Sequence, residues 1–341
     1  MKSIAIVTNS LTGGGAERSM NLLADGLVDA GWNVYLVPVN SSDSDTLFIK
    51  SKVVQVGRTW NGTLSNSLKS FKNFSREIRD IPADIIVLNC DLPEFLSVFI
   101  PWKKTIIVVE HTTNAWNGRK FLGFLIRIQL ILRNARWVRV ASHIKPWPVR
   151  KIEVKTIPNI VKAVDISLPC LYQPVKRLVF IGRFSSEKNP ELLLDISIAS
   201  GLPALMIGDG VIRQNLEKIA SSSQCEIEFT GFMKNPWSRI LPGDLVVITS
   251  SYEGDGLVLL EAIIRGIPVL VRNVPDLARF NLPAKNSFLS VKNASDAILS
   301  NSMDVGAFQV PDEIRKNLTL ERSEQKVIEM WETFLNQFKV P

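Results

Sequence analysis

The chain has 341 residues, of which 46% are hydrophobic and 21% are charged, and its formal net charge is +7. This length suits two α/β domains of roughly 150 residues each. No apolar run reaches the ~18 residues of a membrane span, and three well-separated cysteines fit neither a disulfide framework nor a zinc cluster. The apolar run after Lys2 is too short for an export signal, so we expect a cytoplasmic protein.

Basic residues are concentrated in the first half of the chain. Residues 1–165 hold 22 Lys and Arg against 13 Asp and Glu, whereas the remainder holds 18 against 20. Residues 100–155 alone carry 12 basic and 2 acidic residues. Such a patch attracts phosphate, in a nucleotide, a nucleic acid or an anionic membrane surface, although a merely solvated face is the simpler interpretation.

Short apolar strands alternate with helical patterns along this half. Residues 4–8 predict a buried strand, and apolar residues at helical spacing from Ala16 to Leu27 predict a helix that ends at Gly31. Further strands of the same sheet are expected at 34–39, 84–88, 105–109 and 137–141.

The pattern starts again after a polar, proline-bearing linker at residues 163–174. Strands are expected at 177–181, 204–207, 226–229, 245–249 and 268–271, and helices near 190–200, 211–221 and 257–265. A final amphipathic helix carries one apolar stripe, formed by Val327, Trp331, Phe334, Leu335 and Phe338. The alternation predicts an α/β protein with two doubly wound, Rossmann-like domains.

Three glycines, Gly13 to Gly15, lie between the first strand and the first helix. They let the backbone pass close to a ligand, and the helix N-terminus behind them offers N–H groups to an anion. Glu17 and Arg18 stand where the dinucleotide fingerprint needs its third glycine, so that fingerprint is excluded. A plain tight turn is the alternative.

A second candidate follows the strand at 245–249. Glu253 lies on a loop, and Glu261 lies about two turns into the next helix. The backbone amides from Gly254 to Leu257 can hold a diphosphate at the helix N-terminus, and the carboxylates suit sugar and ribose hydroxyls. A helix start with a solvated glutamate is the alternative.

Cations follow the first strand of the second half, where Gly182 precedes Arg183 and Lys188. Because the carboxyl ends of parallel strands face the ligand crevice, both cations are placed for a diphosphate. Gly208-Asp209-Gly210 marks the next strand end in the same way. Surface charge is the alternative for both segments.

His111 follows the strand at 105–109, and this position favours a functional role over a purely structural one. The acidic pair Asp43 and Asp45 lies in a polar loop with no third ligand nearby. We therefore predict no metal site there.

Together these segments resemble glycosyltransferase family 4, which comprises retaining enzymes of the GT-B fold. The resemblance runs over nearly the whole chain and is most specific at the paired glutamates, from Ser251 to Val269. Its other segments are Gly13-Gly14-Gly15-Ala16-Glu17, His111, Pro158-Asn159, Gly182-Arg183, Lys188-Asn189, Gly208-Asp209-Gly210 and Phe229-Thr230-Gly231-Phe232.

The resemblance implies two Rossmann-like domains that face each other across a cleft. Residues 1–165 would bind the acceptor, residues 166–318 would bind the nucleotide sugar, and a C-terminal helix at 319–341 would cross back to the first domain. No metal or other cofactor is expected, because cations and backbone amides carry the charge stabilisation.

The resemblance also assigns roles to individual residues. Glu253 would hold donor-sugar hydroxyls, Glu261 the ribose, Arg183 and Lys188 the diphosphate, and His111 would face the donor sugar. The expected catalytic residues are thus His111, Arg183, Lys188 and Glu253. The expected donor-binding residues are Gly14, Gly15, Gly182, Arg183, Lys188, Gly208, Phe232, Glu253, Gly254, Asp255, Gly256, Leu257 and Glu261.

Two segments depart from the family's pattern. Asp255 stands where the family commonly has an aromatic or small residue, and residues 272–276 lack the usual glycine pair. A carboxylate beside a diphosphate is costly unless it accepts from another group, so we expect Asp255 to face the donor sugar or the acceptor.

We therefore predict a retaining, metal-independent glycosyltransferase that moves a hexose or N-acetylhexosamine from a nucleotide sugar, UDP-linked by family habit, to a growing glycan or lipid-linked acceptor. Two alternatives stay open: a UDP-sugar epimerase or hydrolase with the same fold, and a basic nucleic-acid-binding module. The tryptophans of the basic region share no strand face on which bases could stack, which disfavours nucleic acid as a partner.

Residues 119–136 predict an amphipathic helix whose core face comprises Phe121, Phe124, Ile128 and Ile131. Its opposite face interleaves basic and apolar residues, namely Arg119, Lys120, Arg127 and Arg133 with Leu122, Ile126 and Leu130. This pattern suits a helix in the headgroup region of an anionic membrane, which would make the protein peripheral at the inner face of the cytoplasmic membrane. A partner-protein contact or ordinary core with a charged rim is the alternative.

Overall fold

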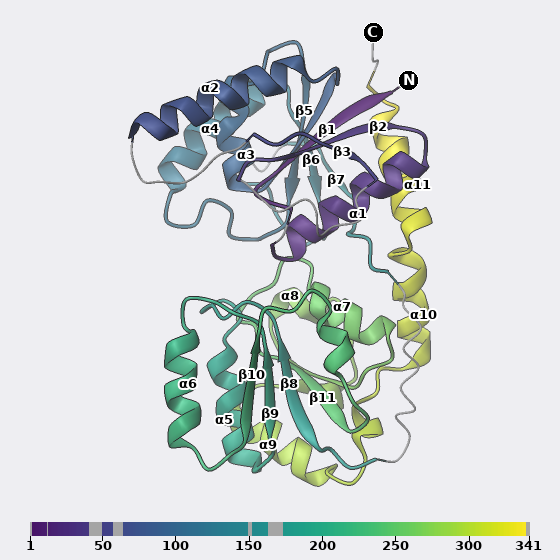
Figure 1. Cartoon of the computed structure of the whole chain (residues 1–341). Helices are drawn as coiled ribbons and strands as arrows, with labels where there is room; N and C mark the ends of the chain where they lie inside the picture. The colour runs from purple at the N-terminus through teal and green to yellow at the C-terminus, as the bar shows by residue number, and fades with distance from the viewer. Residues whose placement is uncertain are drawn as a thin grey trace. The chain divides into compact units, whose positions relative to one another are not determined.

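The structure, a computed structural model, describes residues 2–11, 13–40, 50–56, 64–148, 152–162 and 173–338, with the backbone alone for 64–71. It contains two compact units (Figure 1). Unit 1 comprises Met1–Ile160 with Arg322–Pro341, and unit 2 comprises Val161–Glu321. The last helix therefore belongs to unit 1, and the break between the units falls at residue 160.

Within its described residues, unit 1 forms a seven-stranded parallel sheet of order β3-β2-β1-β4-β5-β6-β7. The strand order reverses between β1 and β4, so the carboxyl ends of these strands mark the crevice where such sheets bind ligands. The strands are β1 (Ser3–Thr8), β2 (Asn33–Pro38), β3 (Lys52–Val53), β4 (Ile85–Asn89), β5 (Thr105–Glu110), β6 (Arg136–Arg139) and β7 (Val154–Thr156).

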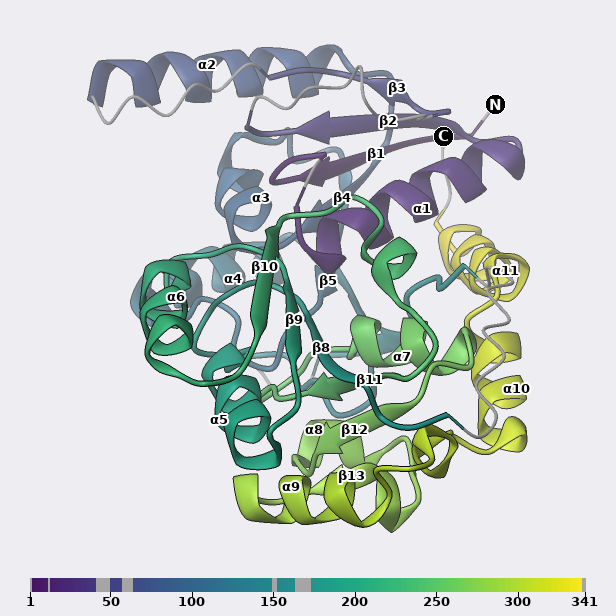
Figure 2. The same ribbon diagram turned by 60° about the horizontal axis from the view of Figure 1, so that its bottom comes forward.

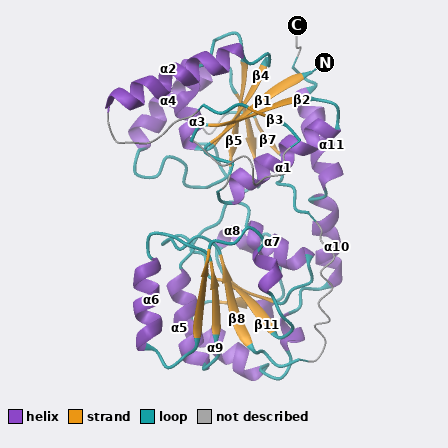
Figure 3. Ribbon diagram, in the orientation of Figure 1, coloured by secondary structure: helices purple, strands orange, loops and turns teal. Residues whose placement is uncertain are grey.

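Helices cover both faces of this sheet (Figure 3). Side chains alternate along a strand, so Ile4 and Ile6 pack toward α1 (Gly15–Asp29) and α11 (Glu324–Leu335), whereas Ala5 and Val7 face the other way. The second face is covered by α2 (Leu64–Asp80), α3 (Asp91–Leu96) and α4 (Lys120–Leu132), with a short 3-10 helix at Ser97–Phe99. The result is a three-layer unit with one core on each side of the sheet.

Unit 2 repeats this plan with six described strands, all parallel, in the order β10-β9-β8-β11-β12-β13. Here the order reverses between β8 and β11. The strands are β8 (Arg177–Ile181), β9 (Ala204–Ile207), β10 (Ile227–Gly231), β11 (Asp244–Ile248), β12 (Val269–Arg272) and β13 (Ser287–Phe288).

The helices of unit 2 also lie on two faces. One face carries α5 (Pro190–Ser200), α6 (Arg213–Ser222) and α9 (Val291–Ser300), and both views place α5 and α6 beside β9 and β10 (Figures 1 and 2). The other face carries α7 (Leu257–Ile264), α8 (Pro275–Ala278) and α10 (Asp312–Glu321). Single 3-10 turns occur at Pro236–Arg239, Ala284–Asn286 and Val305–Phe308.

The predicted fold class is confirmed, because both units are parallel, doubly wound α/β sheets covered by helices. The ten predicted strands are present with ends shifted by a residue or two. The strands β3, β7 and β13 were not predicted. Each is two or three residues long, which is too short to show a periodic apolar pattern.

The faces assigned to α4 from the sequence are largely wrong, although Ile131 packs against the core as expected. Phe121 and Phe124, expected in the core, are 77% and 43% exposed. Ile126 and Leu130, expected to face a membrane, are buried, and Leu122 lies at the boundary with 37% exposure.

Arg127 provides the physical reason. Its side chain is 1% exposed and forms ion pairs with Glu94 of α3 and Glu110 of β5, at 2.7 Å and 2.6 Å. A buried cation needs such partners, and a helical wheel cannot show them because they come from other elements. Arg127 was expected on the solvent side of α4, but these ion pairs bury it together with Ile126 and Leu130. No helix among the described residues is long and apolar enough to span a membrane.

Candidate active site

The loops that follow β8 and β11 bring the expected residues of unit 2 together at the reversal of strand order. Two hydrogen bonds tie these loops to each other: the Ser251 amide donates to the Glu187 carbonyl over 2.8 Å, and Thr249 Oγ1 donates to the Lys188 carbonyl over 2.8 Å. The carboxyl ends of the two strands thus form one connected rim, where open parallel sheets bind ligands.

Glu253 lies within this rim and is only 8% exposed. Its Oε1 accepts from Lys188 Nζ over 2.7 Å and from Ser250 Oγ over 2.7 Å. Its backbone amide donates to Asp276 Oδ2 over 2.9 Å. Both the carboxylate and the backbone of Glu253 are therefore oriented by the protein itself, as a residue that binds a specific hydroxyl requires. The other expected cation, Arg183, is exposed on the loop after β8.

The ends of β8, β9 and β10 approach one another very closely. At Gly208, whose φ is +148°, an added Cβ would lie 1.8 Å from the carbonyl oxygen of Gly182. The Gly208 amide donates to the Gly231 carbonyl over 2.9 Å, and Phe232, the next residue, is 67% exposed. Only glycine fits at residue 208, because any Cβ would clash with the backbone at Gly182.

The helix α7 begins at this rim. Gly256 caps it in the left-handed region with φ of +70°, and Leu257 is its first residue. Glu261 lies one turn further along, where its Oε2 accepts from Trp237 Nε1 over 2.7 Å. The amides at the start of α7 can receive an anion, and Glu261 is held in a defined orientation beside them.

Asp255 does not stand alone beside these amides. Its side chain is 3% exposed, and its Oδ1 accepts from an Arg279 guanidinium nitrogen over 2.9 Å. Arg279 of unit 2 therefore compensates the Asp255 carboxylate, which the sequence led us to expect beside the donor sugar or the acceptor.

The expected residues of unit 1 lie at the carboxyl ends of its own sheet. Gly14 is the extended N-cap of α1, Gly15 is its first residue, and His111 follows β5 as a half-buried side chain. Between β1 and β4, Asn89 Nδ2 donates to Thr8 Oγ1 over 3.0 Å. The neighbouring Thr12 and the acidic pair at 43 and 45 lie outside the described residues.

Glu110, which precedes His111, belongs to the Arg127 cluster, defined here as Glu94, Glu110, Trp116 and Arg127. Arg127 Nε donates to Glu94 Oε2 over 2.8 Å, and Trp116 Nε1 donates to the same oxygen over 2.7 Å. Burial raises the pKa of Glu110 to about 7, while Arg127 opposes that rise and Glu94 adds to it. One arginine is shared by two buried carboxylates directly behind the expected sugar-facing histidine.

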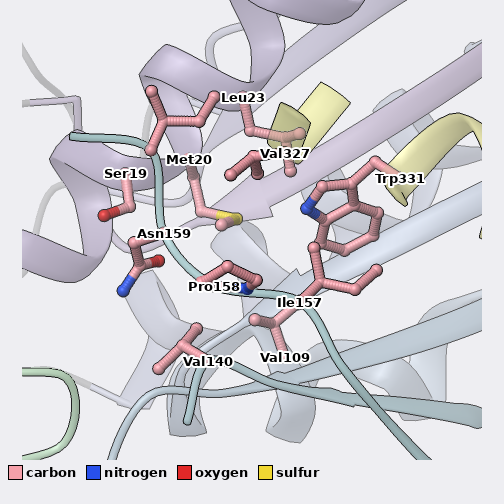
Figure 4. A pocket seen from close by; sticks show the side chains of 11 residues that line it. Ser19, Met20, Leu23, Val109, Val140, Ile157, Pro158, Asn159, Val327 and Trp331 are labelled. Atoms are coloured by element: carbon pink, nitrogen blue, oxygen red, sulfur yellow. The ribbon is translucent and has the colours of Figure 1, made fainter. Parts of the chain in front are cut away.

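A small cavity of about 10 Å³ also lies in unit 1, between α1, α11 and the ends of β5 and β7 (Figure 4). Met20, Trp331, Pro158 and Asn159 line it. This volume is about that of a single water, so the Pro158-Asn159 segment packs against the core here and offers no room for a sugar. Within the described ranges, no group of three or more His, Cys, Asp and Glu side chains is arranged to hold a metal ion.

Sequence reasoning missed several residues that organise the site, namely Ser250, Trp237, Asp276, Arg279, Glu94 and the role of Arg127. Ser250 lies between two segments that were singled out, and Asp276 lies within a third. A proline at the first position of a helix, as at Pro275, is a recognisable signal of a helix start. Arg279 lies 24 residues from Asp255, and no sequence spacing connects them.

Comparison with known proteins agrees with this geometry. The family described as Glycosyl transferases group 1 matches residues 171–305, which lie in unit 2. A GalNAc-alpha-(1->4)-GalNAc-alpha-(1->3)-diNAcBac-PP-undecaprenol alpha-1,4-N-acetyl-D-galactosaminyltransferase from Campylobacter jejuni is 26% identical over 278 residues, covering 77% of each chain. A poly(ribitol-phosphate) alpha-N-acetylglucosaminyltransferase from Staphylococcus aureus is 26% identical over 194 residues, which are 53% of this chain and 39% of that protein.

Solved structures share the fold over the full length. Anabaena HepE in complex with UDP and glucose superposes with a TM-score of 0.80 at 14% identity, covering 99% of this chain and 100% of that one. The Staphylococcus aureus protein TarM gives a TM-score of 0.77 at 16% identity, covering 98% and 99%. The fold, the group 1 match and the bacterial relatives together support a glycosyltransferase of the GT-B fold.

Proposed function

We propose that this chain is a retaining glycosyltransferase of family 4 that moves a hexose or N-acetylhexosamine from a UDP-sugar to a growing glycan or lipid-linked acceptor, without a metal ion. The names of two similar proteins support the choice of substrates. The Campylobacter relative acts on an undecaprenol-linked glycan, and HepE binds UDP and glucose. The epimerase or hydrolase and the nucleic-acid module are not favoured by these relatives.

The observation that carries the proposal is the arrangement of Lys188, Ser250 and Glu253 at the reversal of strand order in unit 2. The Lys188 ammonium is already within 2.7 Å of Glu253 Oε1, so one cation can bridge a sugar-binding carboxylate and a diphosphate oxygen. Arg183, exposed on the same loop, supplies a second positive charge. Glu261, at the start of α7, would receive the ribose hydroxyls.

In the proposed reaction the bond between the anomeric carbon and the UDP oxygen breaks as the acceptor hydroxyl attacks from the same face. The new glycosidic bond forms, and the acceptor proton passes to an oxygen of the departing phosphate. Negative charge grows on that phosphate, and Arg183, Lys188 and the amides before α7 would stabilise it. These groups take the part that a divalent cation plays in other phosphate chemistry.

A thermal-shift panel of UDP-, GDP- and ADP-sugars tests the donor. A specific ligand raises the melting temperature by mass action, so the UDP-sugar should give the largest shift. Turnover should need an acceptor, persist in EDTA and give the donor's anomeric configuration in the product, as read by NMR. Donor turnover without acceptor would identify the epimerase or hydrolase, and a rate restored only by magnesium or manganese would reject the metal-free mechanism.

We further propose that the outer face of α4 contacts an anionic membrane and so brings unit 1 to a lipid-linked acceptor. The exposed stripe differs from the one expected from the sequence: Phe121, Leu125 and Leu132 are 77%, 50% and 71% exposed. Exposed basic residues, Arg119 and Lys120, begin the same helix. Apolar side chains beside cations suit the headgroup region, where each cation near an anionic surface adds ~1 kcal/mol.

Vesicle co-sedimentation tests this contact. Binding should require anionic lipid, decrease with salt and decrease for Phe121→Ser/Leu125→Ser. Leu299→Ser, which alters a residue of unit 2 that is 51% exposed, is the matched control and should bind as the wild type does. Equal binding to neutral vesicles, or none, would reject the membrane contact.

A further inference from the structure

The two departures from the family's pattern meet in space. Asp255 lies on the loop before α7, and the segment that lacks the glycine pair leads into α8 and Arg279. One guanidinium nitrogen of Arg279 donates to the Asp255 carbonyl over 2.7 Å and to Asp255 Oδ1 over 2.9 Å. The guanidinium Nε also donates to the Asp276 carbonyl over 3.2 Å. Arg279 therefore joins the donor loop to α8.

The same short helix holds the donor loop at two further points. Asp276 Oδ2 accepts from the amide of Glu253, and Gly256 packs so closely on α8 that an added Cβ would lie 3.0 Å from Leu277 Cδ2. The Arg279 guanidinium itself lies over the Phe280 ring, 4.3 Å from its centroid. These contacts restrict the rotamers of Arg279 and hold its charge against the loop.

The burial of the pair gives it an electrostatic consequence. The Asp255 side chain is 3% exposed and the Arg279 side chain is 22% exposed, so solvent screens the carboxylate poorly. Loss of Arg279 would remove a positive charge that lies 2.9 Å from the Asp255 carboxylate, beside the amides that begin α7. A nucleoside diphosphate approaching those amides would then be repelled.

We propose that Arg279 is a positioning and charge-neutralising residue of the loop before α7, and that its ion pair with Asp255 keeps this loop able to bind a nucleoside diphosphate. The inference rests on the proposed function, because it requires the diphosphate to bind at the start of α7. It assigns Asp255 to Arg279 rather than to the sugar or the acceptor.

The pair Arg177–Asp244 is a matched control within the same unit. Its atoms are 2.7 Å apart, and its side chains are 18% and 3% exposed, close to the values of the Arg279–Asp255 pair. Arg177 and Asp244 begin β8 and β11, so they lie at the amino ends of the strands, away from the proposed donor site. Loss of either pair should have a similar effect on the stability of unit 2, but only loss of the Arg279–Asp255 pair should change the affinity for UDP.

The experiment measures UDP binding by calorimetry at low and high salt for the full chain and its variants. Arg279→Gln should weaken UDP binding about tenfold at low salt, because it removes the positive charge beside the Asp255 carboxylate. Asp255→Asn should bind UDP at least as well as the wild type, and Asp255→Asn/Arg279→Gln should recover most of the lost affinity. Arg177→Gln should bind UDP unchanged.

The outcomes separate this inference from the proposed function. If the wild type did not bind UDP, the proposed function and this inference would both be wrong. If the wild type bound UDP but Arg279→Gln bound it equally well, only the role of Arg279 would be wrong. If the double variant were as weak as Arg279→Gln, the pair would act through loop shape alone and charge neutralisation would be rejected. Thermal unfolding of each variant confirms that it is folded.

Discussion

Arg127 in unit 1 and Arg279 in unit 2 each hold acidic side chains beside a loop at the carboxyl end of a parallel sheet, but they differ in burial. The Arg127 side chain is 1% exposed and has two carboxylate partners, whereas that of Arg279 is 22% exposed and is paired with Asp255. A fully buried cluster is completed when the chain folds, and solvent or a ligand reaches it poorly. A partly exposed pair at a ligand-binding rim remains within the electric field of whatever binds there.

The difference suggests a division of roles. The Arg127 cluster joins α3, α4 and β5, whereas Arg279 holds the loop before α7, where we propose that the donor binds. Substitutions in the first cluster should therefore change mainly stability, and substitutions around the donor loop should change mainly binding and turnover. The following predictions test that separation.

The largest effect is expected for Arg127→Leu. It leaves Glu94 and Glu110 buried without their shared cation, and removing one partner of a buried ion pair costs about 3–5 kcal/mol of stability. Denaturant unfolding followed by tryptophan fluorescence measures it for unit 1. Replacing all three charged groups together, as Arg127→Leu/Glu94→Gln/Glu110→Gln, should recover part of the loss. A loss below about 1 kcal/mol for Arg127→Leu would contradict the structural role of the cluster.

Arg183→Ala and Lys188→Ala should reduce turnover rather than stability. In the proposed mechanism each of these cations stabilises the departing diphosphate, so turnover should decrease by a factor of about 10² or more. Arg183 is exposed, so the stability of Arg183→Ala should remain within about 0.5 kcal/mol of the wild type. Steady-state kinetics and unfolding of the same preparations provide the test. Turnover that is unchanged in Arg183→Ala would remove this residue from the mechanism.

The two glutamates of the donor loop should differ from each other. Glu261→Ala should weaken UDP binding by ~1.5–3 kcal/mol, because the proposed function assigns Glu261 charge-assisted hydrogen bonds to the ribose. Glu253→Ala should abolish turnover with a smaller loss of UDP affinity, because its carboxylate is expected to contact the sugar. Calorimetry with UDP and assays with the UDP-sugar distinguish these effects. Trp237→Phe removes the donor to Glu261 and is expected to reproduce a fraction of the Glu261→Ala effect.

The smallest effect concerns pH. Burial raises the pKa of Glu110 to about 7 in the folded protein, above its ordinary value of 4.5, and burial raises the pKa values of Glu94 and Asp91 as well. Between about pH 4.5 and pH 7 the folded protein keeps a proton on Glu110 that the unfolded chain has released. The resulting stability is complete below about pH 4.5 and is lost as the pH rises through 7.

Glu110→Gln should make the melting temperature of unit 1 less dependent on pH within this window, because an amide does not titrate. Melting curves at pH 5, 6 and 7 measure the slope. A slope as steep as that of the wild type would assign the titration to Glu94 or Asp91 instead.

Much of the fold was determined by local sequence. Strands such as residues 4–8 and 177–181 are short apolar runs between turn-forming residues, and their alternation with amphipathic helices specifies parallel, doubly wound sheets. The rim of unit 2 was equally visible, because Gly182, Gly208 and the paired glutamates follow predicted strands. Each of these features is determined by residues that are close together in the sequence, so a sequence pattern can reveal them.

The tertiary structure alone decided which charges are compensated and which face of a helix is buried. The sequence of α4 allowed either of two helix faces to pack against the sheet. The face that carries Arg127 is buried, because Arg127 forms ion pairs with Glu94 and Glu110 on two other elements. Asp255 likewise seemed to be an uncompensated charge until α8 placed Arg279 beside it. Charge compensation acts through space over a few ångströms, whereas the partners lie tens of residues apart, and no local pattern records that distance.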